Sequence, residues 1–553
     1  MFNVKIITNN KINAFVLNKI IFTVFFIREC LYLVNGGTTY DTFELWNGSN
    51  RIYSKLVLLK NFQLDSSLLN DLNVYDFFGY VFLFPAFLLE RFINKNLFDI
   101  NNQSLFEISN FFISENGMTF FVLQFSLLLY SFLILIIINK KIIKIESVQV
   151  SNYFLIILFL IPSFSGHLIF NLKDIPFALN LFLASIYVYD FFDDVKANKT
   201  LKSFFVTAFF IAISMSVRLS AILFFLFLFC FIALKNKFNL KVLNSISKLF
   251  FVSIILLIVL TPQSWINPFN WLQATFEFQT QHQWGSWTLT NGKYISAQDV
   301  SNDYLITWFI FRTPIVLSAL FLVSVYFLIK NKKINFSFYC FIFVLANFLL
   351  FPFINPTAYD GLRHYLYLYL FISFITASSI GQLKFKNKVA KQLILTLLTI
   401  HLLYTQFGLE QYRYTYLNEF ADEENISYFC ENSIDGCGDW ITDYWGFSGM
   451  ETAKYANNNL SNEKILVCSP GHSFDTYIKL GQLNFDYLYV EEIINEKDVY
   501  VFTLHRPRYK NDSCGFLKYN INFECDLIYQ NSRQLRGKEM ALSYISKCNL
   551  DSN

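Results

Sequence analysis

Nine ionisable residues stand near the ends of long apolar runs, where a charge is costly unless it has a partner or a function. They are Asp41, Glu44, His167, Lys173, Asp174, Arg218, Asp360, Arg363 and His364. A carboxylate in such a set can act as general base on an acceptor hydroxyl, and cations can stabilise the charge that develops on a departing phosphate. The set therefore indicates group transfer from a phosphate-linked donor at a membrane surface.

Each of these residues also has a simpler explanation. Asp41 and Glu44, which share one face if helical, fit a solvated loop. Asp174 fits the start of a helix, where the dipole favours a carboxylate, with Lys173 as its local partner. The two arginines can reach lipid headgroups, and each histidine can be structural. Convergence of the set in one outward-facing cavity would separate a single site from these independent explanations.

The composition is that of a membrane protein. Of 553 residues, 54% are hydrophobic and 15% are charged, which is too apolar for an ordinary soluble domain. The net charge of +3 argues against a nucleic-acid partner. Apolar runs that approach or exceed the roughly 17–25 residues needed to cross a bilayer recur through the first three quarters of the chain.

Short lysine-rich loops fix the predicted orientation. They begin near residues 139, 193, 235, 330 and 384, and the positive-inside rule places them in the cytoplasm. We expect an α-helical polytopic protein with eleven crossings, with its amino terminus inside and its carboxyl terminus outside. The predicted crossings are 14–34, 118–138, 151–165, 175–191, 202–217, 219–234, 246–262, 304–329, 337–354, 363–381 and 390–406.

One further apolar stretch, Val74 to Ile93, is predicted to be a helix lying in the outer interface. It contains Gly79 and Pro85, and counting it as a crossing would place every later basic loop outside. It belongs to the outer loop 35–117. The membrane domain is then 1–406, with an outer domain over 407–553.

The last region alternates short apolar runs with polar stretches, which predicts a small α/β domain. The predicted strands are Glu463 to Ser469, Phe485 to Val490 and Asp498 to His505. Six cysteines lie here, and an even number in an oxidising compartment favours up to three disulfides, although reduced thiols are the alternative. Proximity in sequence favours the pairs Cys430–Cys437 and Cys514–Cys525.

Several segments, in order, resemble the type C (GT-C) glycosyltransferase superfamily. They are similar to the bacterial family 39-like relatives of protein O-mannosyltransferases and of the lipid A aminoarabinose transferase. The matching segments are "YDTFE", "YDFFGYVFLFPAFLLE", "SGHLIFNLKDIPFAL", "SVRLS", "TPQSWINPF", "YLITWFIFRTP", "YDGLRHYLYLYL", "YRYTYLNEF" and "DYWGFSG". The resemblance extends to about Gly449. It departs from the family where adjacent acids are usual in the first loop, because Thr42 follows Asp41 here.

The resemblance implies inverting transfer of a sugar from a polyprenyl-phosphate donor to a lipid, glycan or protein acceptor at the outer face of the inner membrane. Asp41 would be the base, with Glu44 supporting it. The carrier phosphate would be bound by Lys173, Arg218, Arg363 and His364. The pocket would be shaped by His167, Asp174 and Asp360. Some superfamily members bind a divalent metal, and the sequence gives no basis for assigning one.

Two other functions fit a membrane protein that handles lipid-linked saccharides. A flippase or transporter would bind the lipid without chemistry, but predicts charges deep within spans and internal repeats. A polymerase or ligase would use the same class of donor with a different acceptor. A protein that only anchors the last domain in the membrane would need one span and no ordered polar residues, so this function fits the sequence least well. The donor sugar, the acceptor and the role of the last domain are not fixed by the sequence.

Overall fold

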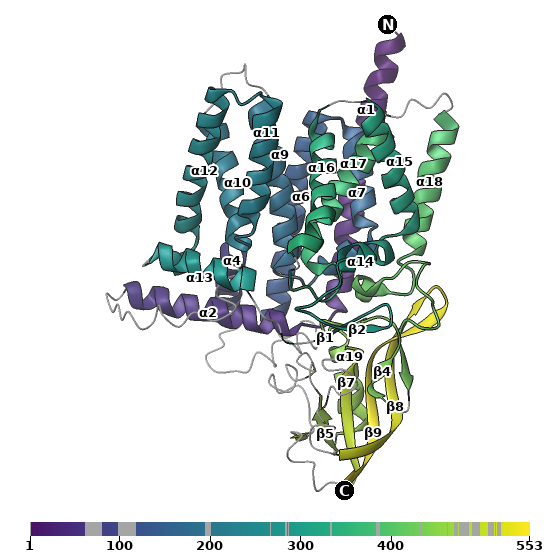
Figure 1. The fold of residues 1–553 in the computed structure, drawn as a ribbon. Helices are drawn as coiled ribbons and strands as arrows, with labels where there is room; N and C mark the ends of the chain where they lie inside the picture. Colours follow the sequence, from purple (N-terminus) through teal and green to yellow (C-terminus); the bar gives the residue numbers. More distant parts are fainter. Residues whose placement is uncertain are drawn as a thin grey trace.

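The computed structural model contains a bundle of helices with a β-sheet domain at one end (Figure 1). The described residues are all except 1, 61–79, 98–117, 194–200, 266, 282–284, 286, 332–333, 355, 383–387, 431–432, 462, 469–473, 475–485, 489–497, 507–513, 515, 517–520 and 553. The two termini lie at opposite ends of the molecule.

Helices occupy all eleven ranges that the sequence predicts as crossings. They are α1 (Phe2–Val34), α6 (Met118–Ile145), α7 (Val148–Phe159), α8 (Pro162–His167), α9 (Asp174–Asp193), α10 (Leu201–Val217), α11 (Ala221–Lys235), α12 (Leu240–Leu260), α14 (Tyr304–Arg312), α15 (Ile315–Asn331), α16 (Phe336–Ile354), α17 (Tyr367–Gln382) and α18 (Lys388–Tyr404). The predicted class, a polytopic helical membrane protein with a small α/β domain, is confirmed.

By length and composition, four helical segments of the described chain can each cross a membrane alone. They are Phe121–Ile145, Asp174–Phe192, Leu240–Leu260 and Phe336–Ile354, and the bent pair of α14 and α15 makes a fifth. The window in Asp174–Phe192 is 89% buried and that in Leu240–Leu260 only 22% buried. Helix α9 is therefore central, whereas α12 presents apolar side chains such as Phe251 and Val259 outward, as a lipid-facing helix does.

The range 304–329 differs from its prediction as one straight crossing. Helix α14 ends at Arg312, α15 begins at Ile315, and the two are bent by 114°. The break falls at Thr313 and Pro314. Proline disfavours helical backbone in the preceding residue, and Thr313 is extended, with φ −102° and ψ 129°.

Two helices lie across the end of the bundle that carries the sheet, namely α2 (Tyr40–Lys60) and α13 (Pro268–Gln281) (Figure 1). Helix α4 (Tyr80–Leu97) covers most of the predicted interfacial helix and contacts both α2 and α6. The first part of that prediction, residues 74–79, lies outside the described residues. Helix α2 carries Asp41, one of the polar residues predicted for the site, in its first turn.

The carboxyl-terminal domain is built on a five-stranded sheet in the order β6-β5-β7-β9-β8. Strands β5 (Lys464–Val467), β6 (Asp486–Leu488) and β7 (Asp498–Leu504) lie within the three predicted strands and run parallel. Side chains alternate along β7: Val499 and Val501 face one apolar cluster, and Phe502 and Leu504 face another that includes α19 (Gly449–Asn459).

The two longest strands, β8 (Ile521–Leu535) and β9 (Lys538–Ser552), were not predicted from the sequence. They form a hairpin whose two-residue turn, Arg536 and Gly537, has φ of 52° and 87°. Positive φ at both turn residues suits the twist of a hairpin. The strands carry many charged and amide side chains, so apolar alternation gives only a weak signal there.

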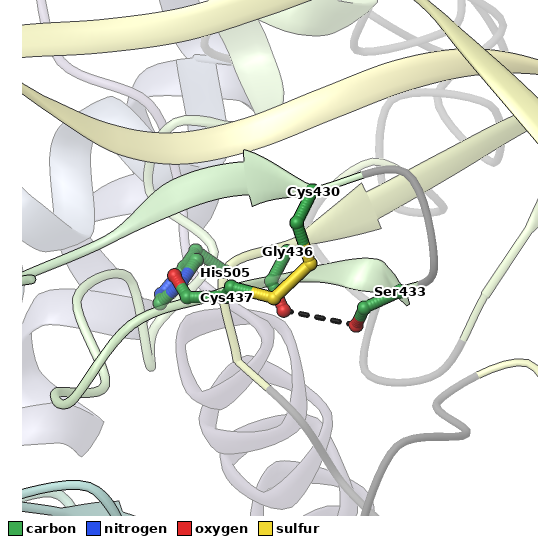
Figure 2. Close-up of a disulfide and its surroundings, with 5 residues drawn as sticks. All are labelled: Cys430, Ser433, Gly436, Cys437 and His505. Atoms are coloured by element: carbon green, nitrogen blue, oxygen red, sulfur yellow. Dashed lines mark hydrogen bonds between the residues drawn. A yellow bond between two sulfur atoms is a disulfide. The ribbon is translucent and has the colours of Figure 1, made fainter.

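Three disulfides tie this domain together. The predicted pair Cys430–Cys437 is present and joins the small hairpin of β3 (Tyr428–Cys430) and β4 (Ser433–Cys437) (Figure 2). The predicted pair Cys514–Cys525 is wrong, because the bridges are Cys468–Cys514 and Cys525–Cys548. Cys525 and Cys548 are directly opposite each other on β8 and β9. Distance along the sequence does not reveal this pairing, because it depends on the register of the two strands.

Candidate functional site

Asp41 and Lys173 meet at the end of the bundle nearest the sheet domain. Asp41 lies in the first turn of α2, where the helix dipole favours a carboxylate, and Lys173 immediately precedes α9. Lys173 Nζ is 2.7 Å from Asp41 Oδ2, and the lysine side chain is 6% exposed while Asp41 is 19% exposed. A buried cation thus faces a carboxylate that solvent can still reach.

Asn171 holds the start of α9, and with it Lys173 and Asp174, in position. Its side-chain oxygen accepts hydrogen bonds from the backbone N–H groups of Lys173 and Asp174, at 3.3 and 2.9 Å. Its amide nitrogen donates to Asp174 Oδ2 at 3.0 Å. Arg218, in the turn between α10 and α11, pairs with the other oxygen of Asp174. Asn171 was not among the residues predicted for the site, although Asn is a favoured capping residue at the start of a helix.

Arg363 lies between the two carboxylates. Its Nη2 is 3.8 Å from Asp41 Oδ2, and its Nε is 3.7 Å from Asp174 Oδ2. The turn before it has positive φ at Asp360 and Gly361, 57° and 62°, and a Cβ at Gly361 would stand 2.9 Å from the Trp308 ring. The chain therefore needs glycine to bring Arg363 to this position.

Aromatic rings enclose the Arg363 guanidinium. Its central carbon is 4.9 Å from the Tyr359 ring, 5.3 Å from that of Tyr444 and 4.5 Å from that of Trp445. Such cation–π contacts fix a guanidinium that stays charged. The last two rings come from the region between α18 and α19, so the carboxyl-terminal region contributes directly to the site. Their segment, "DYWGFSG", is one of those that resemble the superfamily, but neither residue was predicted to belong to the site.

The cluster carries a net positive charge. Lys173, Arg218 and Arg363 supply three positive charges against the two carboxylates of Asp41 and Asp174, which leaves +1. Burial opposes ionisation of Asp41, but Lys173 and Arg363 outweigh it and hold the pKa of that carboxyl below its ordinary value. At neutral pH Asp41 is a carboxylate that can accept a proton.

Of three further predicted site residues in the described part of the chain, His364 contacts the cluster directly, whereas His167 and Glu44 make no ion pair with it. His364 Nε2 accepts a hydrogen bond from Arg363 Nε at 3.1 Å, so it touches the arginine directly. His167 is buried, with Nδ1 2.6 Å from the Ser163 carbonyl oxygen. Glu44, one turn after Asp41, is half-buried and takes part in none of the ion pairs found among the described residues.

Asp360 is also buried, at 6% exposed. Burial raises its pKa to about 7, although Arg363, Arg312 and Arg506 favour its charged form. The carboxyl group is thus poised between neutral and ionised near physiological pH.

A second buried ion cluster, which was not predicted, lies nearby. Glu29 in α1 and Arg413 in η4 (Glu410–Thr415) are both fully buried and 2.5 Å apart, and Arg28 pairs with the same carboxylate at 2.5 Å. Arg28 also donates to the Phe159 carbonyl and to Gln406. These contacts join α1 to the segment after α18. They explain why α1, a largely apolar helix, contains the charged residues Arg28 and Glu29.

The residues of the site do not fit a divalent cation. Asp41 and Asp174 are each matched by lysine or arginine at the distances given above. Within the described part of the chain, no group of three or more His, Cys, Asp or Glu side chains is placed to hold a metal ion.

Comparison with known proteins gives a structural likeness. No family model and no curated protein matches the sequence. The crystal structure of ArnT from Cupriavidus metallidurans bound to undecaprenyl phosphate aligns with a TM-score of 0.51 and 9% identity, over 96% of this chain and 97% of that one. The apo structure of ArnT from Cupriavidus metallidurans aligns less completely, with a TM-score of 0.44 and 9% identity, over 80% of this chain and 86% of that one. The chain thus has the fold of the ArnT structure determined with undecaprenyl phosphate.

Proposed function

We propose that this protein transfers a sugar from a polyprenyl-phosphate donor to an acceptor at the membrane surface. The observation that carries the proposal is the convergence of Asp41, Lys173, Asp174, Arg218 and Arg363. They come from four segments far apart in the sequence and form one ionic network at one end of the bundle. Independent capping or headgroup contacts would not require these segments to meet.

The charge of the network suits the proposed reaction. A sugar–phosphate–polyprenol is a phosphodiester with one negative charge, which matches the net +1 of the cluster. When the acceptor oxygen attacks the anomeric carbon, the bond from that carbon to the phosphate oxygen breaks, and its electron pair stays on the phosphate. The departing phosphate then carries up to two negative charges, and cations placed in advance stabilise it.

Asp41 is the proposed general base. It takes the proton of the acceptor hydroxyl, so its own charge is lost as the phosphate gains one, and the cluster changes from +1 to +2. Attack from the face opposite the phosphate inverts the anomeric carbon. Lys173 and Arg363, which hold Asp41 ionised before the reaction, then become free to bind the more highly charged leaving group.

The similar ArnT structure, which was determined with undecaprenyl phosphate bound, supports a polyprenyl lipid as the donor carrier. The distribution of charge supports the orientation. Lys141 and Lys144 pair with Asp190 near the far end of α9, about 24 Å from Asp174 at 1.5 Å per residue. We propose that this basic end is cytoplasmic and that the site and the disulfide-bonded domain face outward in the inner membrane.

The test is consumption of a radiolabelled polyprenyl-phosphate sugar by the purified protein in lipid, with Asp41→Asn as the variant. We expect the wild type to release the sugar and the variant to lose about 100-fold or more in rate while it still binds donor. Asp190→Asn is the matched control, because Asp190 also lies 2.7 Å from a lysine but at the opposite end of α9.

Two results would contradict the proposal. Equal turnover by Asp41→Asn and Asp190→Asn would remove Asp41 from the chemistry. If the wild type moved the labelled lipid across the bilayer without releasing sugar, the protein would be a flippase. A polymerase or ligase would release sugar as well, and the acceptor that becomes labelled would identify it.

A further inference from the structure

Three buried side chains around Arg363 each have one polar atom without a hydrogen-bond partner among the described residues. The atoms are His167 Nε2, Asp360 Oδ2 and Trp445 Nε1. The three residues are 5%, 6% and 5% exposed. Buried polar atoms are nearly always paired in native proteins, so three such atoms in one place need an explanation.

These residues are close neighbours. The His167 and Trp445 rings are 6.1 Å apart between centroids, and the Trp445 ring is 4.5 Å from the Arg363 guanidinium carbon. The backbone carbonyl of Asp360 accepts a hydrogen bond from the Arg363 N–H at 3.3 Å. Trp445 and Asp360 therefore adjoin Arg363, which belongs to the network that is proposed to bind the phosphate, and His167 packs beside Trp445.

The hydrogen-bonding chemistry of the three atoms is mixed. The Ser163 carbonyl can only accept, so the His167 Nδ1 that contacts it carries the proton, and Nε2 of the neutral ring is an acceptor. Trp445 Nε1 can only donate, whereas Asp360 is an acceptor when it is ionised. A phosphate only accepts, so it could pair with Trp445 Nε1, and with Asp360 when that carboxyl is protonated, but not with His167 Nε2. Hydroxyl groups both donate and accept and could pair with all three.

Hydrogen bonds within the carboxyl-terminal domain fix the backbone on both sides of Trp445. The Asp443 carboxylate accepts hydrogen bonds from the backbone N–H groups of Phe447 and Ser448, at 3.1 and 2.9 Å. Arg506 donates to the Tyr444 carbonyl at 2.6 Å and lies 3.6 Å from the Tyr444 ring.

The residue before Arg506 connects this segment to a disulfide. His505 Nε2 is 2.8 Å from the Cys437 carbonyl oxygen, next to the Cys430–Cys437 bridge (Figure 2). The segment that carries Trp445 is thus linked through Arg506 and His505 to the hairpin that the Cys430–Cys437 disulfide closes.

We infer that His167, Asp360 and Trp445 form the subsite for the sugar of the lipid-linked donor. The ligand class is a polyhydroxylated ring attached to the phosphate that the adjacent cations bind. The inference rests on the proposed sugar transfer. It also assigns a task to the carboxyl-terminal domain, which supplies Trp445 as a specificity-determining residue.

The test compares lipids with and without a sugar. The probes are radiolabelled undecaprenyl phosphate and the undecaprenyl-phosphate sugar that the wild type consumes fastest from a panel of hexoses and pentoses. The variant is Trp445→Phe, which keeps an aromatic ring over Arg363 and removes the Nε1–H donor. Trp440→Phe is the control, because Trp440 is buried in the same segment and packs on Trp308 and Phe311.

We expect Trp445→Phe to bind the sugar-bearing lipid about fivefold to tenfold more weakly, as for loss of one hydrogen bond, and to bind undecaprenyl phosphate within twofold of the wild type. Trp440→Phe should bind both lipids as the wild type does. Equal weakening for both lipids, or no weakening for either, would overturn the subsite. If the wild type consumes no member of the panel, the proposed function fails and the subsite fails with it; turnover with unchanged Trp445→Phe binding removes the subsite alone.

Discussion

Asp360 has a carboxyl group in surroundings that favour its neutral form. Burial raises its pKa to about 7, from an ordinary value near 3.8, against the opposing effect of three arginines. The folded protein therefore holds this proton up to a higher pH than the unfolded chain does. Between roughly pH 4 and pH 7 the folded state binds more protons, so the free energy of unfolding falls as the pH rises through that window.

Asp360→Asn should remove this pH dependence. Asparagine has no carboxyl proton and tolerates the left-handed backbone at this position, where φ is 57°. We expect the thermal unfolding midpoint of the wild type to fall more between pH 5 and pH 7.5 than that of the variant, measured in the same detergent. Parallel curves for the two proteins would show that Asp360 titrates as it does in the unfolded chain.

The start of α9 shows how an element places charges for a site. Asn171 caps the helix and fixes Asp174, and Lys173 is then directed toward Asp41 from α2. The sequence alone predicts the acid at the helix start and the lysine beside it. Their partners in α2 and in the two turns that carry Arg218 and Arg363 depend on how distant segments pack, which local patterns do not encode.

The β8–β9 hairpin packs on the segment of the carboxyl-terminal domain that follows α18. Arg536 at its tip lies 2.6 Å from Glu423 and donates to the Leu417 carbonyl at 2.5 Å, both in the segment after α18. Its side chain is only 7% exposed. The tip of the hairpin thus contacts the segment that follows α18, near the end of the bundle (Figure 1).

Arg536→Ala should loosen this attachment. Loss of a largely buried, charge-assisted contact costs about 1.5–3 kcal/mol. We expect faster amide hydrogen exchange in residues 417–424 while exchange in the bundle helices is unchanged. Lys538→Ala is the control, because Lys538 pairs with Glu424 at 3.2 Å but is 53% exposed. If both variants exchange alike, the hairpin tip does not hold that segment.

At the scale of the molecule, the apolar runs predicted the helices well. Composition and periodicity located a helix in every predicted crossing, because a bilayer demands long apolar helices. The bend at Pro314 could have been read from the proline. The bridges Cys468–Cys514 and Cys525–Cys548 could not, since they depend on strand register and on chain segments brought together by the sheet.

The candidate site was predictable as a set of residues and not as a geometry. The sequence showed which acids and cations stand near the ends of helices, and seven of these nine residues contact one another directly or adjoin the network around Arg363. Glu44 takes no part in the ion pairs, and His167 reaches the site through the Trp445 ring. The contribution of Tyr444 and Trp445 depends on how the carboxyl-terminal domain packs on the bundle, which only a three-dimensional structure shows.

The central claim is that this network binds the phosphate of a polyprenyl lipid, and titration of undecaprenyl phosphate into Lys173→Gln tests it most directly. The matched control is Lys141→Gln, because both lysines lie 2.7 Å from an aspartate, at opposite ends of the bundle. We predict that Lys173→Gln weakens binding about tenfold to a hundredfold and that Lys141→Gln leaves it unchanged. Equal affinity in the two variants, with both proteins folded, would contradict the account.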